Sequence, residues 1–147
     1  MPRSDFAFAH PLRVRWAEVD AQGVVFNGHY LTYFDVGVTE YWRAAGFHYP
    51  GDFTTPDSDL FLIRAAVTYH APAYFDDLLE ICVRCARLGR SSMTYALAIY
   101  RQDTHLTDGE LIYVYANPKT RTAQPLPEDL RERLGRLAPA PDTTHHP

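Results

Sequence analysis

VRWAEVDAQGVVFNGHYLTYFDVGVTEYWRAAG, residues Val14 to Gly46, is the stretch that decides the fold. A short β-rich run carries Asp20 into a loop marked by Gly23, and the loop opens directly onto an aromatic, amphipathic segment. A carboxylate placed just before a helix lies beside backbone N–H groups without helical partners and beside the positive end of the helix dipole. The stretch therefore predicts an acid and a carbonyl-polarising group within a few residues of each other.

The segment after this loop has the apolar spacing of a helix. Its stripe contains Tyr30, Leu31, Phe34, Val38, Tyr41, Trp42 and Ala45. Asn27 is the expected N-cap and Gly46 the expected stop. Gly37 in mid-helix costs about 1 kcal/mol relative to alanine, which predicts close approach of another backbone or of a ligand.

The rest of the chain alternates in the manner of β-strands. Strands are expected at Leu12–Trp16, Leu60–Tyr69, Leu78–Leu88, Ser92–Arg101 and Glu110–Asn117, and a short helix at Glu128–Leu137. Turn residues fill the connections 70–77, 89–91 and 103–109, and short links favour an antiparallel meander. We expect an α+β fold in which a five-stranded sheet curls around the long helix. The prediction is one domain over residues 1–147, with an ordered core at about 11–137, a mobile lead at 1–10 and a disordered tail at 138–147.

The composition is that of an ordinary globular protein. The 147 residues are 46% hydrophobic and 22% charged, with a net charge of −4 that gives no reason to expect nucleic acid as a partner. No apolar run reaches the length of a membrane span, and the N-terminus lacks the apolar core of a secretion signal. The expected location is cytoplasmic.

Two sequence features bear on cofactors and on assembly. Cys82 and Cys85 are three apart in a predicted strand and should point to opposite faces, so neither a zinc site nor a disulfide is expected. Apolar side chains occupy both faces of residues 95–100 and 111–115. Such a sheet needs cover on at least one face or edge, which predicts a homo-oligomer.

Several motifs together resemble those of one family. They are Asp20-Ala21-Gln22-Gly23-Val24-Val25-Phe26 followed by Tyr30-Leu31-x-Tyr33-Phe34-Asp35, then Tyr69-x-x-Pro72-x-x-x-Asp76-Asp77, Leu88-Gly89-Arg90-Ser91-Ser92 and Pro125-Leu126-Pro127. In this order of strands and helices, residues 12–137 resemble the hot-dog fold acyl-CoA thioesterases, specifically the 4-hydroxybenzoyl-CoA thioesterase-like family.

The resemblance implies hydrolysis of an acyl-CoA thioester with a short or medium aliphatic or an aromatic acyl group. Asp20 matches the family's nucleophile or general base, and the backbone N–H at Asn27, with Gly28, matches the group that holds the thioester carbonyl. The other implied site residues are His29 in the first helical turn, Gly23 and Tyr30 at the substrate, and Arg90, Ser91 and Ser92 at the CoA. The resemblance also implies no metal or redox cofactor, and a dimer, or a dimer of dimers, with active sites across the dimer interface.

Each candidate residue also has a purely structural interpretation. Asp20 can cap its own turn, and His29 can be merely exposed. Glu18 can share a face with Asp20 and raise one pKa, or it can be solvated. Arg90 can belong to a plain hairpin. His70 is interpreted as a strand-end residue and His105 as exposed, and no set of His, Asp and Glu has metal-ligand spacing along the chain.

Two other activities stay open for the same fold. One is a protein that binds acyl-CoA or another acyl ligand without hydrolysing it. The other is a dehydratase, which would need a histidine and an acid placed for proton abstraction. His29 and Glu40 fit that need poorly, because eleven residues of helix rise by roughly 16 Å.

Overall fold

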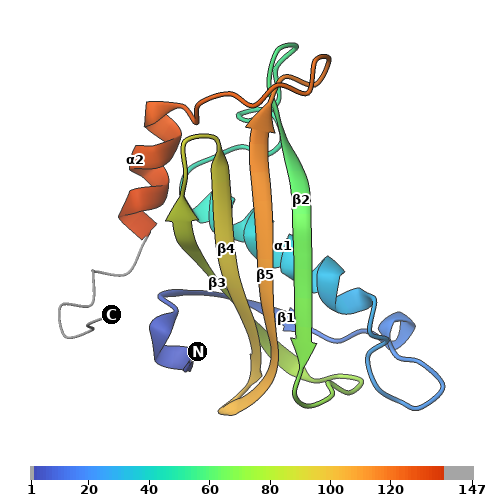
Figure 1. Cartoon of the computed structure of the whole chain (residues 1–147). Coiled ribbons are helices and arrows are strands. Elements are labelled where there is room, and N and C mark those ends of the chain that lie inside the picture. Colours follow the sequence, from blue (N-terminus) through green and yellow to red (C-terminus); the bar gives the residue numbers. More distant parts are fainter. Residues whose placement is uncertain (1, 138–147) are drawn as a thin grey trace.

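A curled antiparallel sheet wrapped around one long helix forms the frame of the protein (Figure 1). The computed structural model describes residues 2–137. In chain order the elements are a 3-10 turn at Arg3–Asp5, β1 (Phe8–Arg13), a 3-10 turn at Trp16–Glu18, α1 (His29–Ala44), β2 (Asp59–Tyr69), β3 (Leu78–Leu88), β4 (Ser92–Arg101), β5 (Thr104–Ala116) and α2 (Glu128–Leu137). The predicted hot-dog arrangement is confirmed.

The order of the strands differs from a simple meander. The sheet runs β1-β3-β4-β5-β2, with every neighbouring pair antiparallel. The consecutive pairing predicted for β3, β4 and β5 is correct, but β2 pairs with β5 rather than with β3. The reason is that β1 occupies the free edge of β3, so β2 is left with the opposite edge of the sheet.

Helix α1 packs its apolar stripe into the concave face of the sheet. Its buried residues recur at helical spacing and are Tyr30, Tyr33, Phe34, Gly37, Val38, Tyr41 and Trp42. A Cβ on Gly37 would lie 2.5 Å from Cγ2 of Ile81 in β3. The space at Gly37 is therefore crowded as predicted, but strand side chains fill it rather than another backbone or a ligand. Leu31 is 42% exposed rather than part of the stripe.

The N-terminal segment is more ordered than predicted. The first strand covers residues 8–13 instead of 12–16, and Trp16 lies in a 3-10 turn with 71% of its surface exposed. Phe6 is buried beside Cys82 and Tyr100 on the outer face of the sheet, and Arg3 pairs with Glu80 at 3.0 Å. These contacts hold the lead, which was expected to be mobile, against the sheet.

The connection predicted at residues 103–109 is mostly strand. β5 begins at Thr104, and the turn before it is short, with Gln102 in the left-handed region at φ 53°. The polar residues that suggested a loop lie on the outer face or pair with β4 and β2. A loop prediction from composition fails here because cross-strand pairing overrides local propensity.

The two cysteines are free thiols, as expected. Cys82 belongs to the buried cluster on the outer face, and Cys85 packs against the main core. Burial raises the pKa of each thiol to about 11, so both are protonated and poorly nucleophilic at neutral pH.

The C-terminal helix closes the far end of the sheet. α2 has the predicted bounds, and it buries Leu130 and Leu134 in the core. The tail at 138–147, predicted to be disordered, lies outside the described residues. No helix within residues 2–137 is long and apolar enough to cross a membrane.

Candidate active site

A short hairpin carries the predicted acid to the start of α1. The Asp20 N–H donates to the Val24 carbonyl at 2.8 Å, and Val19 forms an antiparallel bridge with Val25. Gly23 makes the return possible with φ +80°, a conformation that costs other residues energy. The hairpin therefore fixes Asp20 opposite the strand that leads into the helix.

The Asp20 carboxylate is half-buried at the tip of this hairpin. Its Oδ1 accepts the Gln22 N–H at 2.8 Å, which is the turn-capping bond of the structural interpretation. Its Oδ2 has no hydrogen-bond partner within the described part of the chain. The bond orients the carboxylate and leaves one oxygen free.

Glu18, at the base of the same hairpin, is neither solvated nor paired with Asp20. It is 6% exposed, and it accepts hydrogen bonds from the Arg15 N–H at 2.9 Å, the Arg15 Nε at 2.6 Å and the Tyr33 hydroxyl at 2.8 Å. Burial alone would raise the pKa of Glu18, but these hydrogen bonds and the charge of Arg15 outweigh it and lower that pKa. The expectation of a solvated Glu18 is wrong, and its role is to anchor the hairpin to α1.

The start of α1 offers free backbone donors. The helix begins at His29 with Gly28 as its N-cap residue, one position later than predicted, and no side chain caps it. Among residues 2–137, the N–H groups of Asn27 and Gly28 donate to no acceptor. Unpaired N–H groups at the positive end of a helix form a site for developing negative charge.

A cavity of about 270 Å³ opens beside these donors. Its lining residues come from the hairpin, the helix start and the end of β2: Val25, Asn27, Tyr30, Tyr69, His70, Ala71 and Pro72. The Tyr69 hydroxyl donates to the Asn27 carbonyl at 2.9 Å, and the Tyr30 and Tyr69 rings meet edge to face with centroids 5.2 Å apart. Tyr69 thus fixes the peptide at the helix start.

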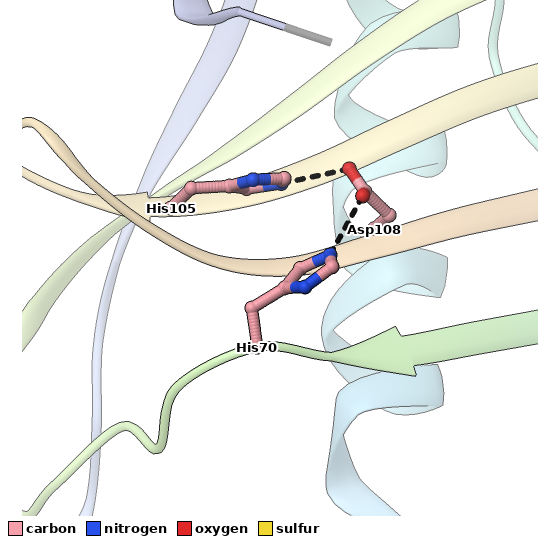
Figure 2. Close-up of side chains that lie close together, drawn as sticks. All are labelled: His70, His105 and Asp108. Carbon is pink, nitrogen blue, oxygen red and sulfur yellow. Dashed lines mark hydrogen bonds and ion pairs between the residues drawn. The ribbon is translucent and has the colours of Figure 1, made fainter.

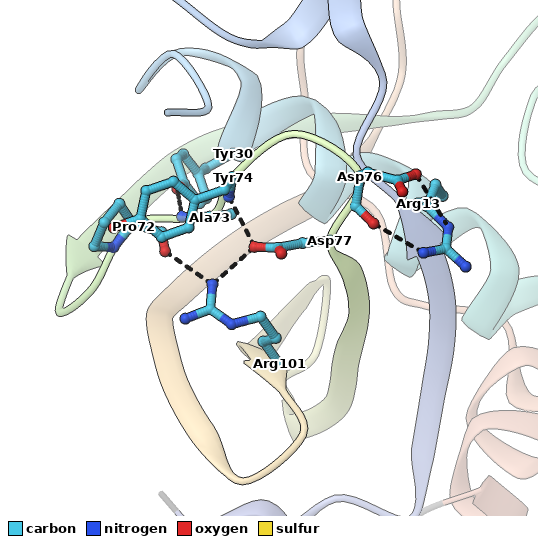
Figure 3. Close-up of polar contacts among 8 residues, drawn as sticks. All are labelled: Arg13, Tyr30, Pro72, Ala73, Tyr74, Asp76, Asp77 and Arg101. Atoms are coloured by element: carbon cyan, nitrogen blue, oxygen red, sulfur yellow. Dashed lines mark hydrogen bonds and ion pairs between the residues drawn. The ribbon is translucent and has the colours of Figure 1, made fainter. Parts of the chain in front are cut away.

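The loop after β2 forms one wall of the cavity, and a polar network holds it in place (Figure 3). The Tyr30 hydroxyl accepts the Ala73 N–H at 3.1 Å. Arg101 donates to the Pro72 carbonyl at 3.1 Å and to Asp77 at 2.8 Å. These contacts explain why the motif from Tyr69 to Asp77 belongs with the helix motif, although the two are far apart in the sequence.

The predicted site residues divide into one group at or near the cavity and a second group at the opposite end of the sheet. Asn27 and Tyr30 line the cavity, and Gly28 and His29 follow at the helix start, where the His29 ring meets Phe26 edge to face at 5.7 Å. Asp20 and Gly23 lie on the adjoining hairpin, although neither lines the cavity itself.

Arg90, Ser91 and Ser92 lie at the opposite end of the sheet. They belong to the β3–β4 hairpin, where α2 packs and Leu126 donates to the Arg90 carbonyl (Figure 1). The register places Ser92 beside Val114 of β5, whereas Tyr69 lies beside Thr107. Seven residues of strand separate these levels by roughly 24 Å. Their predicted role at the CoA stays a prediction.

The sequence did not identify Tyr69 and His70 as site residues. Tyr69 ends a predicted strand and precedes a proline-containing turn, which is the local signal that could have indicated it. His70 is 2.8 Å from Asp108 and close to His105, so three residues from two separate segments meet (Figure 2). Spacing along the chain could not reveal this cluster.

Comparison with known proteins agrees with the fold and identifies the family. The model of the thioesterase superfamily matches residues 22–107, more than half of the chain. A protein of Escherichia coli O6:H1 named acyl-CoA thioester hydrolase YbgC is 28% identical over 125 residues, which are 84% of this chain and 92% of that protein. The acyl-CoA thioesterase YbgC of Haemophilus influenzae is 26% identical over 103 residues, 70% of this chain and 76% of that one.

A solved structure shows the same architecture. The crystal structure of a 1,4-dihydroxy-2-naphthoyl-CoA thioesterase from Synechocystis superposes with a TM-score of 0.82 at 18% identity, and the match covers 95% of this chain and 98% of that one. The fold is thus shared well beyond the matched motif. Because the family model covers more than half of its residues, the chain belongs to the thioesterase superfamily.

Proposed function

We propose that this protein hydrolyses the thioester bond of an acyl-CoA to the free acid and CoA. The observation that carries the proposal is the cavity at the start of α1, where the N–H groups of Asn27 and Gly28 have no partner within the described residues 2–137. A carbonyl oxygen there would accept hydrogen bonds that are absent in the free protein. One such donor contributes about 3–4 kcal/mol to lowering the barrier of an acyl-transfer reaction.

Asp20 would supply the second part of the chemistry. As a general base it would take a proton from water, whose oxygen adds to the carbonyl carbon; as a nucleophile its own oxygen would add, and water would later release the acid. In either route the C–S bond breaks, and the thiol of CoA leaves with a proton. The free Oδ2 of Asp20 suits both routes.

We also propose that the protein is a homo-oligomer that contains a dimer formed along β2. This strand is a free edge of the sheet, and its bulge exposes Leu62 at 52% and Ile63 at 61%. An apolar edge strand invites pairing with another chain. Sedimentation at micromolar concentration should show a dimer or tetramer, and a monomer alone would contradict the proposal.

The activity is tested with a panel of acyl-CoAs and a thiol reagent, beside a thermal-shift screen of the same compounds. Thiol release with aliphatic or aromatic acyl-CoAs supports hydrolysis and identifies the acyl group. Binding without thiol release would instead indicate an acyl-CoA-binding protein.

The role of the helix start has its own test at Asn27. The His29 N–H donates to the Phe26 carbonyl at 2.9 Å, so Asn27 is the second residue of a turn, where proline is favoured. Asn27→Pro removes the side-chain amide and a backbone N–H that has no partner among residues 2–137, and it should lower kcat by about 10²–10³-fold. Asn27→Ala keeps the N–H and should stay within a few-fold of the wild type. Equal rates for the two variants would exclude this donor.

A further inference from the structure

His70, His105 and Asp108 form a compact cluster on the outer face of the sheet, the face turned away from α1 (Figure 2). Nε2 of His70 lies 2.8 Å from Oδ2 of Asp108, and Nε2 of His105 lies 2.7 Å from Oδ1. The two imidazole centroids are 4.6 Å apart. One carboxylate therefore receives both histidines, each at a separate oxygen.

A β-bulge in β5 creates this arrangement. Residues three apart in a regular strand point to opposite faces, but here Ile99 pairs with Thr107 and Tyr100 pairs with His105. Leu106 is the extra residue, and both Leu106 and Thr107 are fully buried. The bulge brings His105 and Asp108 to the same face.

The backbone of His70 and the ring of His105 each have further contacts outside the cluster. The His70 and Ala71 N–H groups donate to the Leu106 carbonyl at 2.8 and 3.1 Å, which joins the end of β2 to the bulge. The His105 ring stacks on Tyr100 with centroids 4.9 Å apart and an interplanar angle of 16°. The cluster is thus built on paired strands rather than on free loop ends.

We propose that His70, His105 and Asp108 bind a divalent transition-metal ion of the Zn²⁺ class. All three ligand atoms lie within 4.8 Å of one another, whereas two ligands of one tetrahedral Zn²⁺ are about 3.3 Å apart. All three side chains are partly exposed, and a modest rotation of them would bring the ligand atoms to that spacing. The ion would bind the Nε2 lone pair of each histidine and one oxygen of Asp108. A proton carried on Nε2 would move to Nδ1 or to solvent, and a water molecule would take the fourth position.

The donor set decides the chemical class of the ion. Imidazole nitrogen with one carboxylate suits Zn²⁺ and its neighbours in the transition series, whereas Mg²⁺ and Ca²⁺ prefer oxygen ligands. The bound ion would join the end of β2 to β5. His70 also lines the cavity at the start of α1, but the proposed thioester hydrolysis does not pass through this ion. Zn²⁺ binding is measured without an acyl-CoA, so each proposal can fail without the other.

Zn²⁺ titration tests the site by calorimetry and by competition with a chromogenic chelator. Because adjacent histidines in the tail can bind Zn²⁺ themselves, the parent protein for all measurements carries His145→Ala and His146→Ala. We expect one Zn²⁺ per chain with micromolar or tighter affinity, a higher Tm with Zn²⁺ than without it, and no such response to Mg²⁺. Bound Co²⁺ should give the visible absorption of a low-symmetry nitrogen and oxygen site.

Two variants and a control make the result specific. His105→Ala and Asp108→Asn should each weaken Zn²⁺ binding by at least about tenfold, since each removes one of three ligands. The exposed His48→Ala, in the loop after α1, should leave it unchanged. Thermal melts without metal show whether each variant is folded. Absence of saturable Zn²⁺ binding by the parent would overturn the proposal. Zn²⁺ binding by His105→Ala and by Asp108→Asn as tight as that of the parent would overturn it too.

Discussion

The base and the tip of the hairpin before α1 each carry a carboxylate, and the two are treated in opposite ways. Glu18, at the base, is buried and receives three hydrogen bonds from Arg15 and Tyr33. Asp20, at the tip, is half-buried and receives one, from its own turn. Glu18 and Asp20 are only two residues apart. Both oxygens of Glu18 accept hydrogen bonds, whereas Asp20 keeps one oxygen without a partner among residues 2–137.

This difference indicates a division of labour. A carboxylate that is saturated with donors holds structure, because any new partner must displace an existing one. A carboxylate that is oriented but incompletely paired can take a proton or attack a carbon. The comparison predicts that substitutions at Glu18 act on stability and that substitutions at Asp20 act on turnover.

The largest effect is expected at the tip. Asp20→Asn keeps the turn-capping oxygen but removes the base or nucleophile, so kcat should fall by about 10²–10⁴-fold while the free energy of unfolding changes little. Steady-state thiol release and urea unfolding measure the two effects. The matched control is Asp103→Asn, an exposed turn aspartate between β4 and β5, which should change neither. Near-wild-type rates for Asp20→Asn would remove Asp20 from the mechanism.

A smaller effect, of the opposite kind, is expected at the base. Glu18→Gln replaces charge-assisted hydrogen bonds with neutral ones and should lower the free energy of unfolding by about 1–3 kcal/mol. Tyr33→Phe removes only one of these bonds and should cost about 1 kcal/mol. Chemical denaturation measures both. If Glu18→Gln is instead as stable as the wild type but inactive, the roles of the two acids are reversed.

Low pH should abolish the contribution of Glu18 to the free energy of unfolding. Because the folded protein lowers the pKa of Glu18 below its ordinary value of 4.5, its stabilisation is fully present above that value and is lost as the pH falls through the folded pKa. The stability gap between wild type and Glu18→Gln should be constant near neutral pH and should narrow below 4.5. Denaturation curves of both proteins over an acid series test this. If the stability gap between wild type and Glu18→Gln instead widens as the pH falls, the folded protein raises the pKa of Glu18.

A smaller loss of stability than for Glu18→Gln is expected at Gly23, which shapes the tip. A Cβ there meets nothing within 4 Å, so the cost of Gly23→Ala arises only from φ +80° and should be about 1–2 kcal/mol. Gly23→Asn should cost less, because asparagine tolerates this conformation better. Urea unfolding of the pair measures the difference. Equal stability of Gly23→Ala and wild type would mean that the tip relaxes freely.

Much of the fold follows from local patterns. The stripe of α1, the centres of β2, β3 and β4, and the bounds of α2 were predicted because apolar periodicity reports which face of an element is buried. The close approach at Gly37 followed in the same way, from the energetic cost of glycine in a helix. The beginning of β5 did not, because its polar residues resemble a loop until β4 and β2 pair with them.

The residues of the candidate site likewise divide into those that local sequence indicates and those that only the pairing of distant segments brings together. Asp20, Asn27 and Tyr30 were identified because they adjoin one another in the motif before and within α1. Tyr69 and His70 join them only after β2 crosses to the edge of β5. The burial of Glu18 depends on Tyr33, fifteen residues away on the buried face of α1, and no spacing rule along the chain predicts that contact.

The sequence by itself determined the helix, most of the strands and the order of acid, loop and helix from Asp20 into α1. Each of these depends on neighbours a few residues away, whose spacing is written directly in the chain. Only the tertiary structure decided which edge β2 takes, which acid is buried and which is free, and that a bulge at Leu106 turns His105 and Asp108 to one face beside His70. These depend on which distant segments pair, and pairing is set by the packing of the whole sheet around α1.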